Sequence, residues 1–330
     1  MHSVELVEVS VTHLESVEPL LCASPFKPYR FVHGIGAPEL VAFWFETAAE
    51  QSRSGTVVVC RRDSRIVGLA ILNELVWESD VIGQGVWGIS QLVAAPGESD
   101  VRDILDRLID RVLILATERG ADTIHCKRFS DDMTACQALQ RRGFLLVDTQ
   151  LVYGFEIGGS SQRRMRGDKA RSGVLRLAQS ADLEELVDVA RASFKNHYGR
   201  FHSDQRLPAG SAIRVYEEWV RSSIRGYADW IVVAEIGGRL AAYSIWRKPA
   251  AREAKLSKRI GHYSIGAVHP DFLGQGLFTE VTRRGLELFD GVADCVVGPT
   301  HVNNYGVQRG YTRLGWHILD ATHTFHAWLS

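Results

Sequence analysis

The sequence predicts two tandem α/β domains, each a mixed sheet flanked by helices. A chain of 330 residues is long enough to form two hydrophobic cores. A pattern repeats with an offset of about 170 residues. Residues 57–71 and residues 231–245 both read as a strand, a tight turn and a second strand. Between the copies, residues 158–167 are polar and rich in turn formers, which is typical of a linker.

The two copies continue with the same elements in the same order. An apolar strand ends near Pro96 in the first copy and near Pro270 in the second, and an amphipathic helix follows each strand. A glycine that closes a short helix then leads into a final strand in each copy. We therefore expect domains at 1–158 and 173–330, with a linker at 159–172.

Composition narrows the functional classes. With 45% hydrophobic and 23% charged residues the chain is an ordinary globular protein, and its formal net charge of −1 argues against nucleic-acid binding. No apolar run approaches the roughly 18 to 20 residues that a membrane span needs, and the first residues lack the pattern of a signal peptide. We expect a cytoplasmic protein that binds a small molecule rather than nucleic acid or membrane, and a homodimer is one open alternative for its oligomeric state.

Cysteines and histidines give no indication of a metal site. The five cysteines lack C-x-x-C spacing, and the 12 histidines form no H-x-x-x-H pair on a predicted helix. Cys60, Cys126 and Cys295 lie in or beside strand-like runs, which favours buried thiols over ligands. We expect no metal.

A glycine loop in the second half is a candidate phosphate site. The strand 263–268 runs into a loop that contains Gly274 and Gly276, and an amphipathic helix follows. Backbone N–H groups at such a helix start are unpaired and lie at the positive end of the helix dipole, so they can bind phosphate oxygens. Two glycines between a strand and a helix are also ordinary turn chemistry, so the loop alone is a weak motif.

The order of motifs around this loop is more specific. Val268-x-Pro270 and the glycine loop are followed by Asn304, then Tyr311, then Leu-Gly-Trp at 314–316. This order resembles the GCN5-related N-acetyltransferases (GNATs), which use acetyl-CoA. The resemblance implies two tandem GNAT-like domains, each with a mixed, mostly antiparallel sheet flanked by helices.

The glycine loop departs from the family pattern Q/R-x-x-G-x-G/A at both ends. Leu273 stands where Gln or Arg is usual, and Phe278 stands where Gly or Ala is usual. Leu273 offers no polar side chain to a diphosphate, so more of the binding would fall on backbone N–H groups.

The resemblance implies that acetyl-CoA binds in the second half. Its diphosphate would lie on the glycine loop, and its pantetheine arm would pair with the strand edge at Ala267 and Val268, where an N–H would also face the thioester oxygen. Asn304 would hydrogen-bond the arm, with a helix N-cap as the equal alternative. The expected cofactor-binding residues are Ala267, Val268, Leu273, Gly274, Gln275, Gly276, Leu277 and Asn304.

Tyr311 is the expected catalytic residue. In the resembled family a tyrosine at this position protonates the CoA sulfur, and a phenol with a pKa of about 10 carries its proton at neutral pH. The alternative is a core aromatic residue one turn before the glycine that ends the helix. About two helical turns separate Asn304 from Tyr311, so both can project from one helix face.

The first half lacks these features. Asp100 stands where the second half has its glycine loop, and Leu139 stands where it has Tyr311. An acidic side chain repels a diphosphate, and leucine has no proton to give. We expect a degenerate first domain that braces the second, completes an acceptor pocket, or only adds stability.

A further set of residues carries a narrower resemblance. The set comprises Val76–Ser79, Ala178, Asp182, Phe194, Arg200, Phe201, Tyr216, Trp219, Arg225, Gly226 and the ending 322–328. These positions, scattered over most of residues 70–330, resemble the dTDP-4-amino-4,6-dideoxygalactose (TDP-fucosamine) N-acetyltransferases. The resemblance implies an amino-sugar acceptor, most simply a nucleotide-linked one.

The acceptor would meet the loop at 197–204, because the connection between the first two helices usually lines the acceptor site in acetyltransferases of this fold. Arg200 is suited to a phosphate, and Tyr198 or Phe201 can stack on a sugar or base. His202 is a candidate proton relay. The alternative is that these polar side chains are only solvated.

The predicted function is transfer of an acetyl group from acetyl-CoA to the amine of an amino sugar, by direct attack in a ternary complex. One alternative keeps the chemistry and changes the acceptor to another small amine, as in mycothiol synthase or aminoglycoside acetylation. The other is a CoA-binding regulator without turnover, which Leu273 and Phe278 favour and which Tyr311 and Asn304 oppose.

Overall fold

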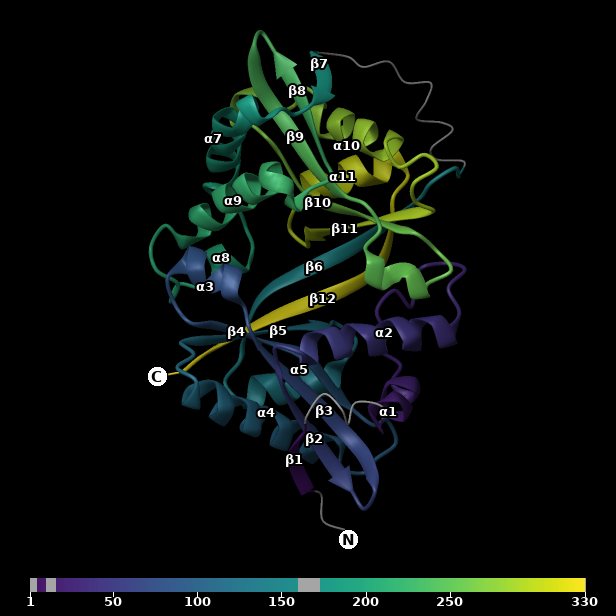
Figure 1. The fold of residues 1–330 in the computed structure, drawn as a ribbon. Helices are drawn as coiled ribbons and strands as arrows, with labels where there is room; N and C mark the ends of the chain where they lie inside the picture. The colour runs from purple at the N-terminus through teal and green to yellow at the C-terminus, as the bar shows by residue number, and fades with distance from the viewer. Residues whose placement is uncertain (1–4, 10–15, 160–172, 330) are drawn as a thin grey trace. The chain divides into compact units, whose positions relative to one another are not determined.

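The computed structural model describes residues 5–9, 16–159 and 173–329, and these form two compact units (Figure 1). The predicted linker lies outside the described residues, apart from Gly159. The first unit comprises Met1–Thr149, Lys255–Ser257 and Ala321–Ser330, and the second comprises Gln150–Ala254 and Lys258–Asp320.

The sheet of the first unit has the strand order β1-β2-β3-β4-β5-β12. Neighbouring strands are antiparallel except for β4 and β5, which are parallel. The predicted hairpin at 57–71 is β2–β3. The strands are β1 (Glu5–Val9), β2 (Thr56–Arg62), β3 (Arg65–Glu74), β4 (Val86–Ala94), β5 (Thr123–Phe129) and β12 (His317–Trp328).

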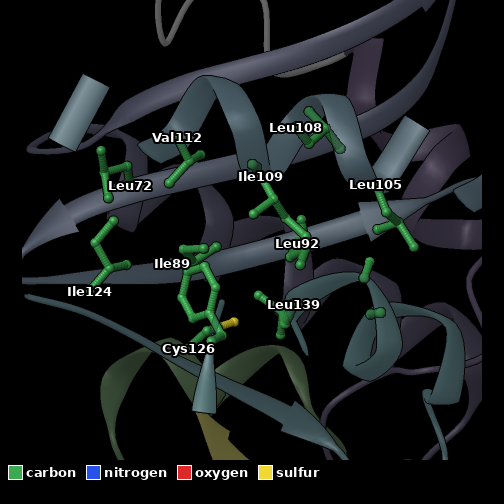
Figure 2. Close-up of a cluster of buried hydrophobic side chains, with 14 of the residues drawn as sticks. Leu72, Ile89, Leu92, Leu105, Leu108, Ile109, Val112, Ile124, Cys126 and Leu139 are labelled. Atoms are coloured by element: carbon green, nitrogen blue, oxygen red, sulfur yellow. The ribbon is translucent and has the colours of Figure 1, made fainter. Parts of the chain in front are cut away.

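Helices cover both faces of this sheet. Residues of β2 alternate between them, since Val58 and Cys60 belong to the core beneath α4 and α5 whereas Val57 and Val59 belong to the core beneath α1 and α2. Figure 2 shows the first of these cores, with Leu108 and Val112 of α4 pointing toward the strands. The helices are α1 (Glu18–Ala23), α2 (Ala37–Ser52), α3 (Val76–Ile82), α4 (Val101–Glu118) and α5 (Met133–Arg141).

The sheet of the second unit repeats this arrangement with the order β6-β11-β10-β9-β8-β7. Its neighbours are antiparallel except for β10 and β11, which are parallel. The predicted fold class is thereby confirmed. The strands are β6 (Leu145–Glu156), β7 (Val174–Leu177), β8 (Trp230–Ile236), β9 (Arg239–Arg247), β10 (Ile260–Val268) and β11 (Cys295–His301).

The last strand of each repeat completes the sheet of the other repeat. β6 follows α5 in the chain, yet its residues 150–156 pair with β11 in the second unit. β12 closes the second repeat, yet its residues 322–328 pair with β5 in the first unit. Each sheet therefore needs both halves of the chain.

Two helix pairs cover the second sheet. In Figure 1, α7 and α9 lie on one face of β8–β10, and α10 and α11 lie on the other. The helices are α7 (Leu183–Phe194), α8 (Arg200–Ser203), α9 (Ser211–Ser222), α10 (Leu277–Glu287) and α11 (Tyr305–Leu314), with the short turns η2 (Ser180–Asp182), η3 (Ser223–Tyr227), η4 (Ala251–Lys255) and η5 (Pro270–Phe272).

Cys60, Cys126 and Cys295 are buried in strands, as the packing interpretation predicts. Burial raises the pKa of Cys60 to about 12, so its thiol is protonated at neutral pH. Among the described residues, no helix is both long and apolar enough to cross a membrane.

Candidate functional site

The parallel pair β10 and β11 diverges after a short ladder. The ladder joins Ile260–His262 to Cys295–Val297. From Tyr263 onward β10 keeps only its ladder with β9 within the described chain, and the register of that ladder shifts between Tyr263 and Ile265. One edge of β10 therefore offers backbone N–H and C=O groups to a ligand that carries amides.

The glycine loop lies at the end of this open edge. Gly274 and Gly276 have φ of 80° and 81°, a conformation that favours glycine. A Cβ on either residue would meet nothing within 4 Å, so backbone conformation rather than space requires glycine here. Gly276 is the N-cap of α10 and makes no side-chain cap, which leaves N–H groups of the first turn for a ligand.

A cavity of about 1190 Å³ joins the loop to the strand edge. Its wall is formed by the end of β10, the glycine loop, the first half of α10, one side of α11 along its length, and the end of α7. The structure brings all eight predicted cofactor-binding residues to this wall: Ala267, Val268, Leu273, Gly274, Gln275, Gly276, Leu277 and Asn304.

Two of these residues also have structural partners. Asn304 is the N-cap of α11, because its Oδ1 accepts a hydrogen bond from Val307 N at 3.4 Å. Asn304 therefore caps the helix and also lines the cavity. The carbonyl oxygen of Val268 accepts a hydrogen bond from Ser193 Oγ at 2.9 Å, so α7 already uses part of the strand end.

Tyr311 is fully buried and does not form part of the cavity wall. Its ring stacks on Trp316 with centroids 4.6 Å apart, and it lies 5.7 Å from the ring of Phe278, which does line the cavity. Phe278 also approaches α11 closely, since a Cβ on Gly310 would lie 2.6 Å from its ring. Phe278 and Gly310 thus form a complementary large and small pair.

The hydroxyl of Tyr311 lies where β10 and β11 diverge. A Cβ on Gly298, the residue after the last one in β11 that pairs with β10, would lie 3.2 Å from the Tyr311 Oη. On the β10 side, the Tyr263 ring is edge-on to that of Tyr311 at 5.8 Å, and the buried Tyr311 hydroxyl has no hydrogen-bond partner within the described chain. Burial raises the pKa of Tyr311 well above its ordinary value, so the phenol is protonated at neutral pH.

Positive charge gathers on the outer wall. Arg309 and Arg313 are exposed, line the cavity and lie one turn apart on α11, a helix that contains no acidic residue. Arg283 lines the same cavity but pairs with Glu287 at 2.5 Å. Glu280 adds one opposing carboxyl group to the wall. The balance favours an anionic ligand.

Comparisons with known proteins identify the fold. No family model matches the sequence. The structure is similar to a tandem GNAT protein from the clavulanic acid biosynthesis pathway, with a TM-score of 0.61 and 14% identity over 99% of this chain and 98% of that chain. It is also similar to a GCN5-related N-acetyltransferase from Sphaerobacter thermophilus, with a TM-score of 0.61 and 13% identity over 98% and 95% of the two chains. The chain has the tandem GNAT fold.

One curated relative is similar in sequence. It is the spore coat polysaccharide biosynthesis protein SpsD of Bacillus subtilis, which is 22% identical over 272 residues, or 81% of this chain and 86% of that protein.

The two GNAT units differ at the position of the glycine loop. In the first unit Asp100 precedes α4, and its carboxylate pairs with Arg62, which lowers the pKa of Asp100. Arg62 pairs with Glu98 as well. Ion-paired side chains thus stand where the second GNAT unit has glycines. Leu139, at the position of Tyr311, is fully buried.

The predicted acceptor residues lie beside the GNAT cavity. Arg200, Phe201 and His202 lie on α8, and the Arg200 guanidinium stacks over the Phe201 ring at 4.2 Å. Tyr198 is 58% exposed, and its ring lies 6.0 Å from that of His301. None of the four predicted residues forms part of the cavity wall described above.

Sequence reasoning missed part of the wall. The additional residues include Ser193, Phe194, His197, Arg283, Arg309 and Arg313. The i, i+4 spacing of Arg309 and Arg313 on a predicted helix was a usable indication of a cationic face. The place of His197 depends on how the end of α7 packs against β10, which no local pattern encodes.

Proposed function

We propose that this protein transfers an acetyl group from acetyl-CoA to the amine of an amino sugar, most simply a nucleotide-linked (dTDP-) amino-deoxysugar, by direct attack in a ternary complex. The observation that carries the proposal is that the open edge of β10 and the glycine loop share one cavity. An amide-bearing arm that ends in a diphosphate matches both features.

The residues fit acetyl-CoA. The backbone N–H groups in the first turn of α10, after Gly276, would hold the diphosphate. The edge of β10 near Gly266 and Ala267 would pair with the pantetheine amides, and the side-chain amide nitrogen of Asn304 would also bind the pantetheine arm. Bound there, acetyl-CoA supplies a thioester carbonyl to an incoming amine.

Tyr311 is the proposed general acid. Its raised pKa keeps the hydroxyl protonated, and its position beside Gly298 puts that proton at the point where the strands diverge. A thiol arm inserted between β10 and β11 would bring its sulfur toward this hydroxyl. Positioned proton transfer of this kind contributes roughly 10²- to 10⁴-fold to turnover.

The acceptor class rests on two supports. The name of SpsD places a relative in polysaccharide biosynthesis, which supports a carbohydrate acceptor. Beside the cavity, the exposed Tyr198 can stack on a sugar or base, whereas Phe201 is buried and supports the Arg200 guanidinium, which is suited to a phosphate. We assign these residues, with His202, to acceptor binding.

The assay is release of free thiol from acetyl-CoA in the presence of single acceptors. The panel consists of free amino sugars, TDP- and UDP-linked amino sugars, an aminoglycoside and the mycothiol precursor amine. We expect the fastest release with a nucleotide-linked amino sugar. Release only with the aminoglycoside or the mycothiol precursor would contradict a nucleotide-linked acceptor, and release with none of the acceptors would contradict the proposed acetyltransferase activity.

A second candidate, a CoA-binding regulator without turnover, is favoured by one observation. Phe278 lines the cavity and packs against the buried Tyr311. If the ring of Phe278 keeps a thiol away from Tyr311, CoA binds without transfer. Tight CoA binding together with no thiol release on the whole panel would select this candidate.

A further inference from the structure

His197 lines the cavity beside the open edge of β10. It is the first residue of the loop at 197–204 that was predicted to meet the acceptor, but no individual role was predicted for it. Its position is fixed by α7, the last turn of which is bonded to the end of β10 through Ser193 Oγ and the Val268 carbonyl at 2.9 Å. The backbone N–H of His197 donates to the Phe194 carbonyl at 3.2 Å, so the chain turns immediately after that contact. The ring is therefore held against the same wall as Gly266 and Ala267.

Three rings hold the imidazole edge-on. The centroid of His197 lies 5.0 Å from that of Phe194 at an interplanar angle of 86°, and 5.6 Å from that of Tyr216 at 89°. The ring of His202 meets it at 6.1 Å and 81°. Contacts from α7, α8 and α9 restrict the rotamer, which gives the side chain the fixed geometry that proton transfer needs.

The surroundings keep His197 neutral. Burial, with His202 from α8 and His301 from the end of β11, lowers the pKa of His197 to about 4. Tyr216 faces it from α9, Tyr198 lies 6.4 Å away on its own loop, and Glu280 is the carboxyl group on the cavity wall. Because the pKa is lowered, the imidazole is uncharged at pH 6 to 8, and one of its two ring nitrogens has a lone pair available.

We propose that His197 accepts the proton that the acceptor amine loses during transfer; this rests on the proposed function. The amine nitrogen bonds to the thioester carbon while one N–H bond breaks and its proton passes to a ring nitrogen of His197. The carbon–sulfur bond then breaks, and the sulfur takes a proton from Tyr311. His197 releases its proton to water, and Tyr311 regains one from water, so the cycle balances.

The other two histidines of this cluster are less suited to the role. His202 does not form part of the cavity wall, and burial lowers its pKa as well. His301 uses Nδ1 to accept a hydrogen bond from Asn303 N at 3.1 Å. His197 is the histidine whose ring reaches both the cavity and the aromatic cluster.

The expected size of the effect follows from basicity. A base with a pKa far below that of an amine is weak, so its contribution falls at the low end of the usual range, at roughly 10²-fold in kcat. A residue with only a structural role would instead change stability or CoA affinity.

The test compares His197→Gln and His197→Ala with wild type, and uses His317→Gln, an exposed histidine at the start of β12, as the matched control. We expect kcat to fall about 100-fold in both His197 variants, with the Kd of CoA unchanged within about twofold. Added imidazole should restore part of kcat in His197→Ala. The control should match wild type.

A second readout does not depend on turnover. In a ¹⁵N-histidine NMR titration, one resonance should titrate near pH 4 and be missing from His197→Gln. A His197 resonance that titrates at the ordinary value of about 6.5 would show a solvated ring and overturn the assignment.

The outcomes separate this inference from the proposed function. Wild-type transfer together with a kcat within about threefold in His197→Gln overturns the role of His197 alone. A wild-type protein that binds CoA but acetylates no amine overturns the proposed function, and this assignment with it. A larger loss of kcat in His202→Gln, with His197→Gln near wild type, would assign proton acceptance to His202 and would also overturn the assignment to His197.

Discussion

The hydroxyl oxygen of Tyr311 lies 3.2 Å from the position that a Cβ on Gly298 would occupy. Gly298 follows the last residue of β11 that pairs with β10, so the two strands separate at this hydroxyl. A glycine at this position leaves room for the phenol, and the phenol in turn occupies the apex between the strands. The separation of β10 and β11 therefore sets the position of the hydroxyl group of Tyr311, the proposed general acid.

Replacing Tyr311 by Phe should separate chemistry from binding. The ring would keep its stacking on Trp316, while the proton donor would be lost. We expect kcat to fall by roughly 10²- to 10⁴-fold, with little change in the Kd of CoA measured by calorimetry. An unchanged kcat would remove Tyr311 as the acid.

Gly298→Ala should disturb the apex. The added methyl would lie 2.9 Å from the Tyr263 Cβ as well as close to the phenol, so the structure has to shift. Overpacking of this kind costs about 1 to 3 kcal/mol, and displacement of the hydroxyl should lower kcat. Urea unfolding and thiol release measure the two effects.

The matched control for that variant is Gly306→Ala on α11, where an added Cβ meets only Asn304 Oδ1 at 3.9 Å. Alanine is favoured over glycine inside a helix by roughly 0.5 to 1 kcal/mol, so the control should not be destabilised. Equal stability and equal kcat in Gly298→Ala and wild type would show that the apex is not crowded.

The fold was predictable because its indications are local. The hairpins β2–β3 and β8–β9 each combine an apolar strand pair with a tight turn, and the glycine that closes α11 is visible in the sequence. The exchange of β6 and β12 was not predictable. Both strands follow a short helix and a glycine, and nothing local selects which of the two sheets each one joins.

Some residues of the candidate site were likewise predictable from the sequence, and others were not. The glycine loop and the helix start at Asn304 are each visible as a short local pattern in the sequence, and in the structure both line one cavity. His197 reaches that cavity because Ser193 joins α7 to β10, a contact between residues far apart in the chain. The burial of Tyr311 depends on Phe278 of α10, Tyr263 of β10 and Trp316 in the turn between α11 and β12, which are far apart in the chain.

Arg309 and Arg313 should bind a phosphate of CoA. Like charges one turn apart on a helix repel by roughly 0.2 to 0.5 kcal/mol, which an anion would relieve. Each Arg→Gln change should weaken CoA binding by roughly 10-fold, because a charge-assisted hydrogen bond contributes about 1.5 kcal/mol or more. Calorimetry with CoA and with dephospho-CoA measures the effect and assigns the phosphate.

The control for the arginines is Arg284→Gln on α10, which pairs with Glu287 and lies outside the cavity wall. It should leave CoA affinity unchanged. If the α11 variants weaken CoA but not dephospho-CoA, the arginines bind the ribose phosphate; if they weaken both, they bind the diphosphate. No change with either ligand would contradict an anion site on α11.

Asp182 should contribute a pH-dependent stabilisation. Its carboxylate is buried and accepts from Arg176 Nη1 at 2.7 Å and from Gln179 N at 2.7 Å, and the bonds to Arg176 hold its pKa below the ordinary 3.8. A lowered folded-state pKa gives stability that is present above the unfolded pKa and is lost as the pH falls through the folded value.

Asp182→Asn should therefore lower the free energy of unfolding by about 1 to 3 kcal/mol at pH 7, since it leaves Arg176 without its strongest partner. The difference from wild type should shrink below pH 3.8. Urea unfolding across this range measures it. A difference that does not depend on pH would show that the ion pair is not its source.

The affinity of CoA for wild type and for Gly276→Val, measured by calorimetry, tests most directly whether main-chain amides of the glycine loop hold the cofactor. A β-branched residue is strained at a φ of 81°, so the N-terminus of α10 should be distorted. We predict micromolar CoA binding to wild type, on the order of 1 to 100 μM, and a loss of at least about 10-fold in the variant. No CoA binding to wild type, or equal binding by both proteins, would contradict the account.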